Sequence, residues 1–464
     1  MTRHGVVFTM TGIISVLAVL LLASMIVESV IIAPLALVVF AAFCAIILRA
    51  YPVVFILLLW FIFIRLTAVL SSVAIESGGF MPEILTQGDA TGATLRMVAV
   101  YIAGLIALTV ILHGGTRRID RITAQTPQCR LTKLWVPLLY LTLTALISGA
   151  LIIGVKHGFP ALSGADRIAY WRQIDNRFFY FFLGNRFIFA VLLGLCASVS
   201  HGANRMLSLI LMLAMLVVSF LFAEKFSSIA LILFGFLTPV LILTPAFKKH
   251  LDKSVMGLSL LVAVLTVPAT LNAYGVFQNP DNAVMRLQTR AVSQAQIWYV
   301  QDSLDNSIIK FDTDRIDNNI RAMTARHPDQ YADTLGARDF MIGYMPPDRY
   351  EHYLQRGVTL TLATEGYLLK LFGRIGMIPV YSALLGVYAG YLLYLYYGVK
   401  TRHPLRVILA AKLLVWANFG LNQGYVWFLI GVKPALLVAL ILVFEMAQTV
   451  ISKKRAAQKR VAHA

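Results

Sequence analysis

Cysteine is scarce in this chain of 464 residues, which contains three. Cys44 and Cys196 fall within long apolar runs, and Cys129 falls in a short basic segment that we predict to face the cytoplasm. No cysteine is left for the segments that we predict to face outward, where thiols would be oxidised. We therefore expect neither a disulfide nor a cysteine metal site.

The motifs of common soluble enzymes are also absent. The sequence contains no P-loop, no dinucleotide-binding glycine pattern, no His-Glu-x-x-His and no Gly-x-Ser-x-Gly. It shows no internal repeat and no paired broken helices of the kind found in inverted-repeat transporters. Asp312-Thr-Asp314 offers two carboxylates to a metal-bound diphosphate, but an acidic turn of this kind is more often solvated. We predict no metal site and no cofactor.

Charged residues make up only 13% of the chain, whereas hydrophobic residues make up 59%. The apolar runs repeatedly reach the roughly 20 residues that are needed to cross a bilayer. These features predict an all-α polytopic membrane protein with about twelve transmembrane helices. The predicted spans are 5–27, 29–48, 52–74, 97–113, 134–155, 187–200, 206–222, 228–246, 255–275, 375–398, 405–421 and 425–447.

The few charges are distributed unevenly between the two predicted sides of the membrane. With the N-terminus inside, the inner segments hold 19 basic residues and two acidic ones, Asp120 and Asp252, whereas the outer segments hold 18 basic and 19 acidic residues. Basic residues favour cytoplasmic loops. We therefore place both termini in the cytoplasm and attribute the net charge of +18 to the inner rim of a membrane protein rather than to nucleic-acid binding.

Two predicted outward segments, 156–186 and 275–374, are too long to be simple connections between helices. The second is the one place where a small non-membrane subdomain can form, and we expect a short interfacial helix over Gly366–Leu371 near its end. The predicted organisation is helices one to five (1–155), the first long periplasmic loop (156–186), helices six to nine (187–274), the large periplasmic loop (275–374), helices ten to twelve (375–447) and a basic cytoplasmic tail (448–464).

Arginine dominates the outward basic residues. It accounts for 14 of 18, whereas 8 of the 19 inner basic residues are lysine. The guanidinium fork matches phosphate and carboxylate groups, so this bias favours an anionic ligand on the outer side. The alternative is that these arginines pair with the 19 outward acids in surface networks. Our candidates for binding a pyrophosphate are Arg65, within the third span, and Arg167, Arg172 and Arg177, which recur among aromatic residues in the first long loop.

A second group of candidates precedes the tenth predicted span. His352 lies in the stretch Arg349-Tyr-Glu-His-Tyr-Leu-Gln-Arg356 and combines a possible general base with neighbouring arginines. A single loop histidine usually has no such function. We nevertheless select His352, Arg356 and Glu365 as candidate catalytic residues.

Two stretches of the sequence have the form of known motifs. Gly158-Phe-Pro160-Ala-Leu162 followed by Arg167 has the pattern Gly-x-Pro-x-Leu…Arg, and Glu365-Gly-Tyr367, followed by Phe372-Gly373 and Gly376, has the pattern Glu-x-Tyr…Phe-Gly-x-x-Gly. These patterns resemble the outward-loop motifs of a known family, the Wzy-like O-antigen and exopolysaccharide polymerases. The chain departs from the family's Arg-x10-Gly pattern, because Arg326 and Arg356 stand one residue too close to Gly336 and Gly366.

The resemblance implies an integral membrane glycosyltransferase of GT-C-like architecture in the bacterial inner membrane. Such an enzyme joins undecaprenyl-pyrophosphate-linked oligosaccharide repeat units at the periplasmic face, during the synthesis of lipopolysaccharide O-antigen or exopolysaccharide. The implied transfer is metal-independent, with arginines on the pyrophosphate leaving group. The implied partners are the lipid-linked oligosaccharide, membrane lipid, a flippase and a chain-length regulator.

Four other functions remain open at this point. An O-antigen ligase would share the layout and the chemistry and differ in its acceptor. Transferases that use polyprenyl-phosphate monosaccharides have an acidic pair in the first outward loop, where this chain has only Glu28. A lipid-linked oligosaccharide translocase needs no catalytic base and would line a central cavity with charge. A structural or chain-length partner protein is the fourth.

Overall fold

The structure is a computed structural model that describes residues 3–24, 29–125, 135–163, 167–174, 176–224, 226–244, 289, 291–356 and 359–462. These ranges are almost entirely helical and include one two-stranded antiparallel hairpin, β1 (Phe80–Met81) with β2 (Thr86–Gln87). The helices of the first half are α1 (Arg3–Ser24), α2 (Ile32–Ala50), α3 (Pro52–Glu76), α4 (Ala93–Gln125), α5 (Trp135–His157), α6 (Pro160–Ser163), α7 (Arg167–Gln173), α8 (Arg177–Val199), α9 (Ala203–Leu221) and α10 (Phe226–Leu243). Those of the second half are α14 (Gln296–Leu304), α15 (Thr313–Thr324), the 3-10 helix η1 (Pro328–Thr334), α16 (Gly336–Tyr344), α17 (Pro347–Arg356), α18 (Thr364–Lys400), α19 (Pro404–Gln423), α20 (Trp427–Ile430) and α21 (Val432–Ala462).

Nine helices in the described part of the chain are long and apolar enough to cross a membrane. They comprise α2, α3, α4, α5, α8, α9, α18, α19 and the run from α20 into α21. Two shorter apolar helices, Thr9–Leu22 within α1 and Ser227–Leu243 within α10, accompany them. The chain is therefore an all-α, multi-pass membrane protein, which confirms that part of the predicted fold class.

The apolar helices fall where the sequence predicts spans, with two exceptions. The ninth predicted span, 255–275, lies outside the described residues. The sixth predicted span, 187–200, corresponds to α8, which begins much earlier, at Arg177. Its early start has a local cause, because the Asn176 side chain accepts hydrogen bonds from the N–H groups of Phe178 and Phe179 and so caps the helix. Arg177 is thus in the first turn of a membrane-type helix rather than within a loop.

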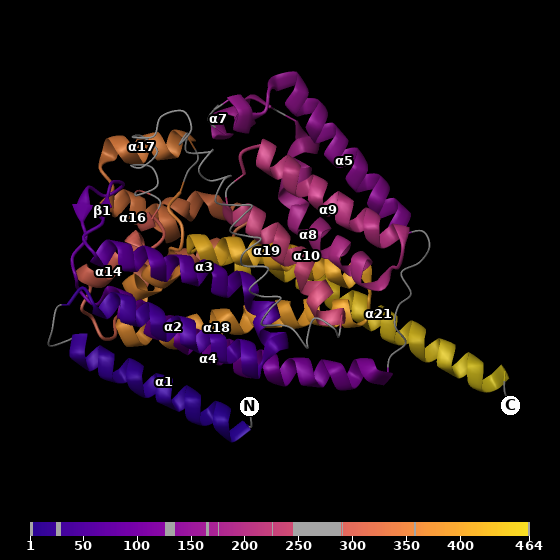
Figure 1. The fold of residues 1–464 in the computed structure, drawn as a ribbon, viewed down its shortest axis with the longest axis horizontal. Coiled ribbons are helices and arrows are strands. Elements are labelled where there is room, and N and C mark those ends of the chain that lie inside the picture. Colours follow the sequence, from indigo (N-terminus) through magenta and orange to yellow (C-terminus); the bar gives the residue numbers. More distant parts are fainter. Residues whose placement is uncertain are drawn as a thin grey trace.

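The helices pack as an elongated bundle (Figure 1). α18 lies against α4 on one side and α19 on the other, while α8 packs against α10, α9 and α19. Fully buried aromatic side chains, among them Phe43, Phe61, Tyr101 and Tyr388, fill the interior between these helices. The hairpin, α14 and α16 gather at one end of the bundle, which we call the loop end, and the C-terminal end of α21 extends from the opposite end (Figure 1).

The loop end has a hydrophobic cluster of its own. It joins Ile297 of α14, Ala322 of α15, Phe340 of α16, Tyr367 of α18 and Trp427 of α20, each at most 4% exposed. The predicted subdomain in 275–374 therefore has a core in its described part. That core is shared with the ends of the membrane-type helices, so the subdomain is fastened to the bundle.

α18 is interrupted at Gly373, whose φ of 73° and ψ of 179° are not helical. The part before the break, from Thr364 to Phe372, contains the short helix predicted over 366–371. The extended segment 307–312 runs beside the break and pairs with the backbone groups that the helix leaves open. Lys310 N–H donates to Phe372 O (3.1 Å), Asp312 N–H to Leu371 O (3.1 Å), Arg374 N–H to Ser307 O (3.0 Å) and Ile375 N–H to Ile308 O (2.9 Å).

Candidate functional site

Two predicted site residues, Arg65 of α3 and Glu365 of α18, form a buried ion pair. Arg65 Nη2 lies 2.5 Å and Arg65 Nε 3.1 Å from Glu365 Oε1, and the two side chains are 2% and 1% exposed. The Tyr381 hydroxyl donates to the same carboxylate oxygen at 2.7 Å. The Arg65 guanidinium also lies 4.4 Å from the centroid of the Phe61 ring. The pair is sealed from solvent, so in this conformation neither residue can touch a diphosphate or an acceptor hydroxyl.

The rest of the Glu365-Gly-Tyr367 motif also makes packing contacts. A Cβ atom at Gly366 would stand 2.9 Å from the Ile297 side chain of α14, so glycine permits this close approach. The Tyr367 hydroxyl accepts a hydrogen bond from Asn319 Nδ2 of α15 at 2.8 Å. The three residues thus connect the first turn of α18 to α3, α14 and α15. These packing contacts give the motif a structural role in this chain.

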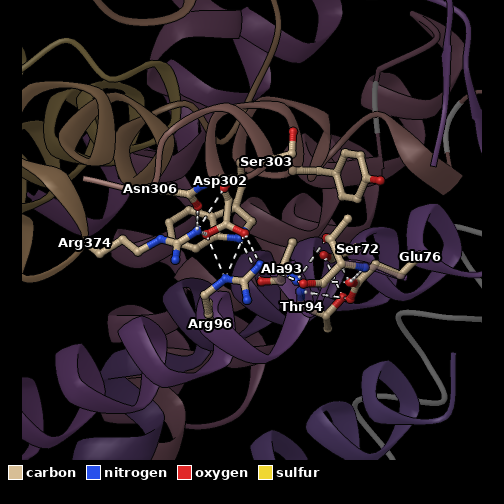
Figure 2. A network of polar contacts seen from close by, with 12 residues as sticks. Ser72, Glu76, Ala93, Thr94, Arg96, Asp302, Ser303, Asn306 and Arg374 are labelled. Carbon is tan, nitrogen blue, oxygen red and sulfur yellow. Dashed lines mark hydrogen bonds and ion pairs between the residues drawn. The ribbon is translucent and has the colours of Figure 1, made fainter. Parts of the chain in front are cut away.

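An arginine-rich clamp that the sequence does not signal lies next to these contacts (Figure 2). Arg96 of α4 binds the Asp302 carboxylate of α14 through Nε (3.0 and 2.9 Å) and Nη2 (2.6 Å), and Asp302 is 1% exposed. Arg374, just after the break in α18, donates from Nη2 to Asp302 O (3.1 Å) and Asn306 Oδ1 (2.9 Å). Both guanidinium groups are therefore occupied in holding α14 between α4 and α18.

Glu76 extends this clamp to α3. Its carboxylate accepts hydrogen bonds from the backbone N–H groups of Thr91, Ala93 and Thr94 at 2.9–3.0 Å (Figure 2). The N–H groups of Ala93 and Thr94 are among those that the start of α4 leaves unpaired, and a negative charge at a helix N-terminus is favourable. The last residue of α3 thus caps the next membrane-type helix, which fixes the relative position of α3 and α4 at the loop end.

A third network occupies the Asp-x-Asp stretch. Arg315 of α15 pairs with Asp312 (2.7 Å) and with Asp339 of α16 (3.0 Å), and Lys370 of α18 also reaches Asp339 (2.6 Å). The hydrogen bonds that Arg315 donates to the Asp339 carboxylate raise the pKa of Arg315 above its usual value. Asp312 additionally caps α15 by accepting the Arg315 N–H. Asp312 is therefore engaged in capping and ion pairing. Within the described ranges, no cluster of three or more His, Cys, Asp or Glu side chains is placed to hold a metal ion.

The two predicted outward loops meet at α17. Arg172 of α7 donates a hydrogen bond from Nη1 to the backbone O of Gln355, near the C-terminal end of α17. A guanidinium group there also suits the negative end of the helix dipole. On its other flank, α17 is tied to the hairpin region, because Arg349 donates to Pro82 O and the Tyr353 hydroxyl donates to Glu83 Oε1 (3.3 Å).

This contact brings candidates from both loops to one exposed region. Arg172 and His352 are both exposed, and His352 lies one helical turn before Gln355, on the same face of α17. Arg356 follows Gln355 directly, and Arg167 begins α7, but the side chains of Arg356 and Arg167 lie outside the described residues. Arg177 is exposed at the start of α8. The candidates therefore divide into a buried pair, Arg65 with Glu365, and a group around α7 and α17.

A cavity elsewhere in the bundle has a different character. It has a volume of about 160 Å3 and lies between α5, α8 and α19, against Trp135, Leu192, Cys196 and Pro404. These residues belong to the helix ends remote from the loop end, and the lining is almost wholly apolar. The cavity therefore contains no group for acid–base or phosphate chemistry.

Comparisons with known proteins add one match. Residues 330–438 match the model of a family of unknown function, DUF6418. The match extends from η1 into α21 and so includes α16–α20, together with His352, Arg356 and Glu365. No curated protein and no solved structure matches the chain.

Proposed function

We propose that this protein is a glycosyltransferase that polymerises undecaprenyl-pyrophosphate-linked oligosaccharide repeat units into O-antigen or exopolysaccharide. The proposal includes a location in the bacterial inner membrane, twelve transmembrane helices, cytoplasmic termini and a site at the loop end that faces the periplasm. The charge asymmetry and the motif resemblance of the sequence support it. The multi-pass helical bundle is compatible with a polyprenyl-linked substrate that stays in the bilayer.

One observation carries the proposal further than the sequence does. The Arg172–Gln355 contact joins the arginine-rich first loop to the helix that bears His352. A transfer between two lipid-linked substrates needs a phosphate-binding group and a proton acceptor in one exposed region. The contact between α7 and α17 supports the proposal, because Arg172 and His352 would supply these two groups.

The proposed reaction uses these groups as follows. A hydroxyl oxygen of the acceptor sugar attacks the anomeric carbon of the donor, and the bond from that carbon to the pyrophosphate oxygen breaks. His352 takes the hydroxyl proton, and undecaprenyl pyrophosphate leaves as an anion that Arg172, with Arg167, Arg177 and Arg356, stabilises. Arg65 and Glu365 act in this proposal as positioning residues, because they hold the first turn of α18 against α3.

The test is polymer formation by purified protein in liposomes. The substrate is lipid-linked repeat units extracted from a strain that lacks this protein, and the readout is a ladder of products on a gel. Arg172→Lys keeps the charge but loses the guanidinium fork, so we expect shorter or fewer products. His352→Ala removes the proposed base, and we expect transfer to slow by about 10²–10⁴-fold.

Arg321→Lys is the matched control. Arg321 is also an outward arginine, but it is 62% exposed and pairs with Asp317 on the surface of α15, so its replacement should leave the ladder unchanged. A wild-type protein that moves the lipid-linked units across the bilayer without a ladder would be a translocase. Product formation only when lipid A core is supplied would identify a ligase. Either result would refute the polymerase proposal.

A further inference from the structure

A short segment at the loop end carries large apolar side chains that the described part of the chain leaves exposed. In residues 304–311, Leu304, Ile308, Ile309 and Phe311 are between 59% and 68% exposed. Four such side chains within eight residues form more than the scattered apolar exposure of an ordinary surface. The segment connects α14 to α15 and was predicted to belong to a periplasmic loop.

This apolar segment is fastened to a membrane-type helix. Its backbone pairs with α18 on both sides of the break at Gly373, and the Phe311 ring lies edge-on to Phe372 with the centroids 6.1 Å apart. A Cβ atom at Gly373 would stand 2.8 Å from Ser307 O. A Cβ atom at Gly376 would reach the Ile309 side chain at 3.7 Å. Gly373 thus lets the segment lie directly on α18, whereas a Cβ atom at Gly376 would make only ordinary contacts.

The exposed apolar surface continues from the segment onto the helix itself. Ile375 and Ile378 follow the break in α18 and are 56% and 37% exposed. α18 is one of the helices with the length and hydropathy of a membrane span, so uncovered isoleucines on it face lipid acyl chains. The side chains of 304–311 extend this lipid-facing surface past the start of the span.

The charges beside the segment do not interrupt this surface, because they are paired with groups of the protein. Lys310 forms an ion pair with Asp305, and Arg374 lies against Asp302 and Asn306. We therefore do not expect Lys310 or Arg374 to be the main binding group for anionic lipid headgroups. The chemistry of the segment favours hydrocarbon rather than a charged partner.

We propose that residues 304–311 form an interfacial segment whose apolar side chains insert among the lipid acyl chains around the loop end of α18. The partner is the bilayer, and the binding is apolar rather than electrostatic. Interfacial segments bury their apolar face about 5–10 Å into the boundary between headgroups and acyl chains. Such an insertion would fix the height of α14, α15 and the break in α18 relative to the membrane surface. This proposal is independent of the polymerase reaction.

Nitroxide labels at single cysteines test the proposal. Cys44, Cys129 and Cys196 are replaced by alanine, and labels are placed in Ile309→Cys and Phe311→Cys in protein reconstituted into liposomes. The measurement compares collisions with oxygen, which concentrates in hydrocarbon, and with a water-soluble nickel chelate. Ile378→Cys on α18 is the reference for lipid exposure, and Asp317→Cys, at a side chain that is 55% exposed on α15, is the reference for water.

We expect the labels at 309 and 311 to resemble the label at 378, with oxygen collisions in excess of nickel collisions, and the label at 317 to show the reverse. Nickel accessibility at 309 and 311 equal to that at 317 would overturn the proposal. Low accessibility to both probes would overturn it too, because it would mean that a second copy or another protein covers the segment. The result should also persist in liposomes without anionic lipid, and its loss there would refute apolar insertion.

A second measurement needs no substitution and so does not depend on the cysteine-free chain folding. Hydroxyl-radical footprinting of the native protein in liposomes modifies side chains that water reaches. Phe311 (68% exposed) and Ile320 of α15 (51% exposed) are both uncovered by the protein. Insertion predicts that Phe311 is protected while Ile320 is modified. Modification of Phe311 would contradict the proposal.

Discussion

A charged side chain within a membrane bundle is tolerated when its partner is buried with it. Arg65 has the Glu365 carboxylate, the Tyr381 hydroxyl beside that carboxylate, and the face of Phe61, so its charge is neutralised inside the bundle. The arrangement is costly to break, because removing one partner leaves an uncompensated charge in a low-dielectric interior. The pair therefore has a structural role whatever chemistry the protein performs.

Single and double substitutions of this pair provide the first prediction. We expect Arg65→Met and Glu365→Met each to lower the free energy of unfolding by about 3–5 kcal/mol, because each leaves an unpaired buried charge. The double variant leaves no charge, so we expect it to lower the free energy of unfolding by less than either single substitution. The measurement is the loss of monodisperse protein on heating in detergent, followed by size-exclusion chromatography.

Glu365→Gln separates this role from a catalytic one. If Glu365 is a positioning residue, Glu365→Gln should lower thermal stability and polymer formation together. If Glu365→Gln kept wild-type thermal stability and abolished the product ladder, Glu365 would act directly in the transfer, as the sequence first indicates. Tyr381→Phe is the milder comparison, because it removes one hydrogen bond and no charge.

Asp305 gives a prediction about pH. Burial raises the pKa of Asp305, but hydrogen bonds from Lys310 and Ser307 outweigh it and hold the pKa below its usual value. Because the pKa is lower in the folded state, this carboxylate stabilises the fold above its unfolded pKa of about 3.9. The stabilisation is lost as the pH falls through the folded value. We expect the protection factors of the amides in 304–312, which are corrected for the intrinsic pH dependence of hydrogen exchange, to fall below about pH 4 and to stay constant between about pH 5 and 8.

Asp305→Asn should remove this contribution at every pH. The protection factors in 304–312 should then be lower than in the wild type at neutral pH and should no longer change on acidification. An identical acid response in the variant would show that another group is responsible.

At the scale of elements, the break in α18 determines how several parts of the loop end are connected. It ends the short helix that holds Glu365 and Tyr367, turns the chain at Gly373 and starts the long membrane-type helix. The same break provides backbone partners for 307–312, so one glycine connects the clamp around Asp302, the interfacial segment and the buried ion pair. The Phe-Gly-x-x-Gly pattern thus has a mechanical explanation in this chain.

Alanine at the two glycines of this pattern should have unequal effects. Gly373→Ala places a side chain at positive φ and within 2.8 Å of Ser307 O, and we expect it to cost about 1–3 kcal/mol of stability. Gly376→Ala is the control, because its Cβ would meet neighbours at 3.4 and 3.7 Å, which is ordinary contact. Thermal unfolding in detergent distinguishes the two, and equal effects would mean that the break does not depend on glycine.

At the scale of the whole molecule, the orientation in the membrane decides whether the loop end can meet periplasmic substrates. Cysteines introduced at Ser163 of α6 and Ser303 of α14, both exposed, should react with a membrane-impermeant maleimide in intact spheroplasts. A cysteine at Ala124, exposed at the far end of α4, should react only after lysis. The reverse pattern would place the loop end in the cytoplasm and remove the basis of the proposed function.

Properties that depend only on residues close together in the sequence could be predicted without the structure. Runs of about 20 apolar residues predict spans, because the bilayer imposes that length on each helix separately. The short helix before Gly373 was likewise predictable, since its pattern is local. The start of α8 was misplaced by the same local reasoning, because Arg177 and the following polar and aromatic residues resemble a loop until Asn176 is known to cap them.

The composition of the candidate site was decided by tertiary structure. Arg65 meets Glu365 across 300 residues, Arg96 meets Asp302 across 206, and Arg172 meets Gln355 across 183. The sequence singled out Arg65 because charge at the depth of a span is rare, and Glu365 because it lies just before the tenth predicted span, yet it assigned Arg65 to pyrophosphate binding and Glu365 to catalysis. It gave no indication of Arg96, Asp302 or Arg374 as a unit. Which charges neutralise one another depends on which helices pack together, and helix packing is set by side-chain shape over the whole bundle rather than by spacing along the chain.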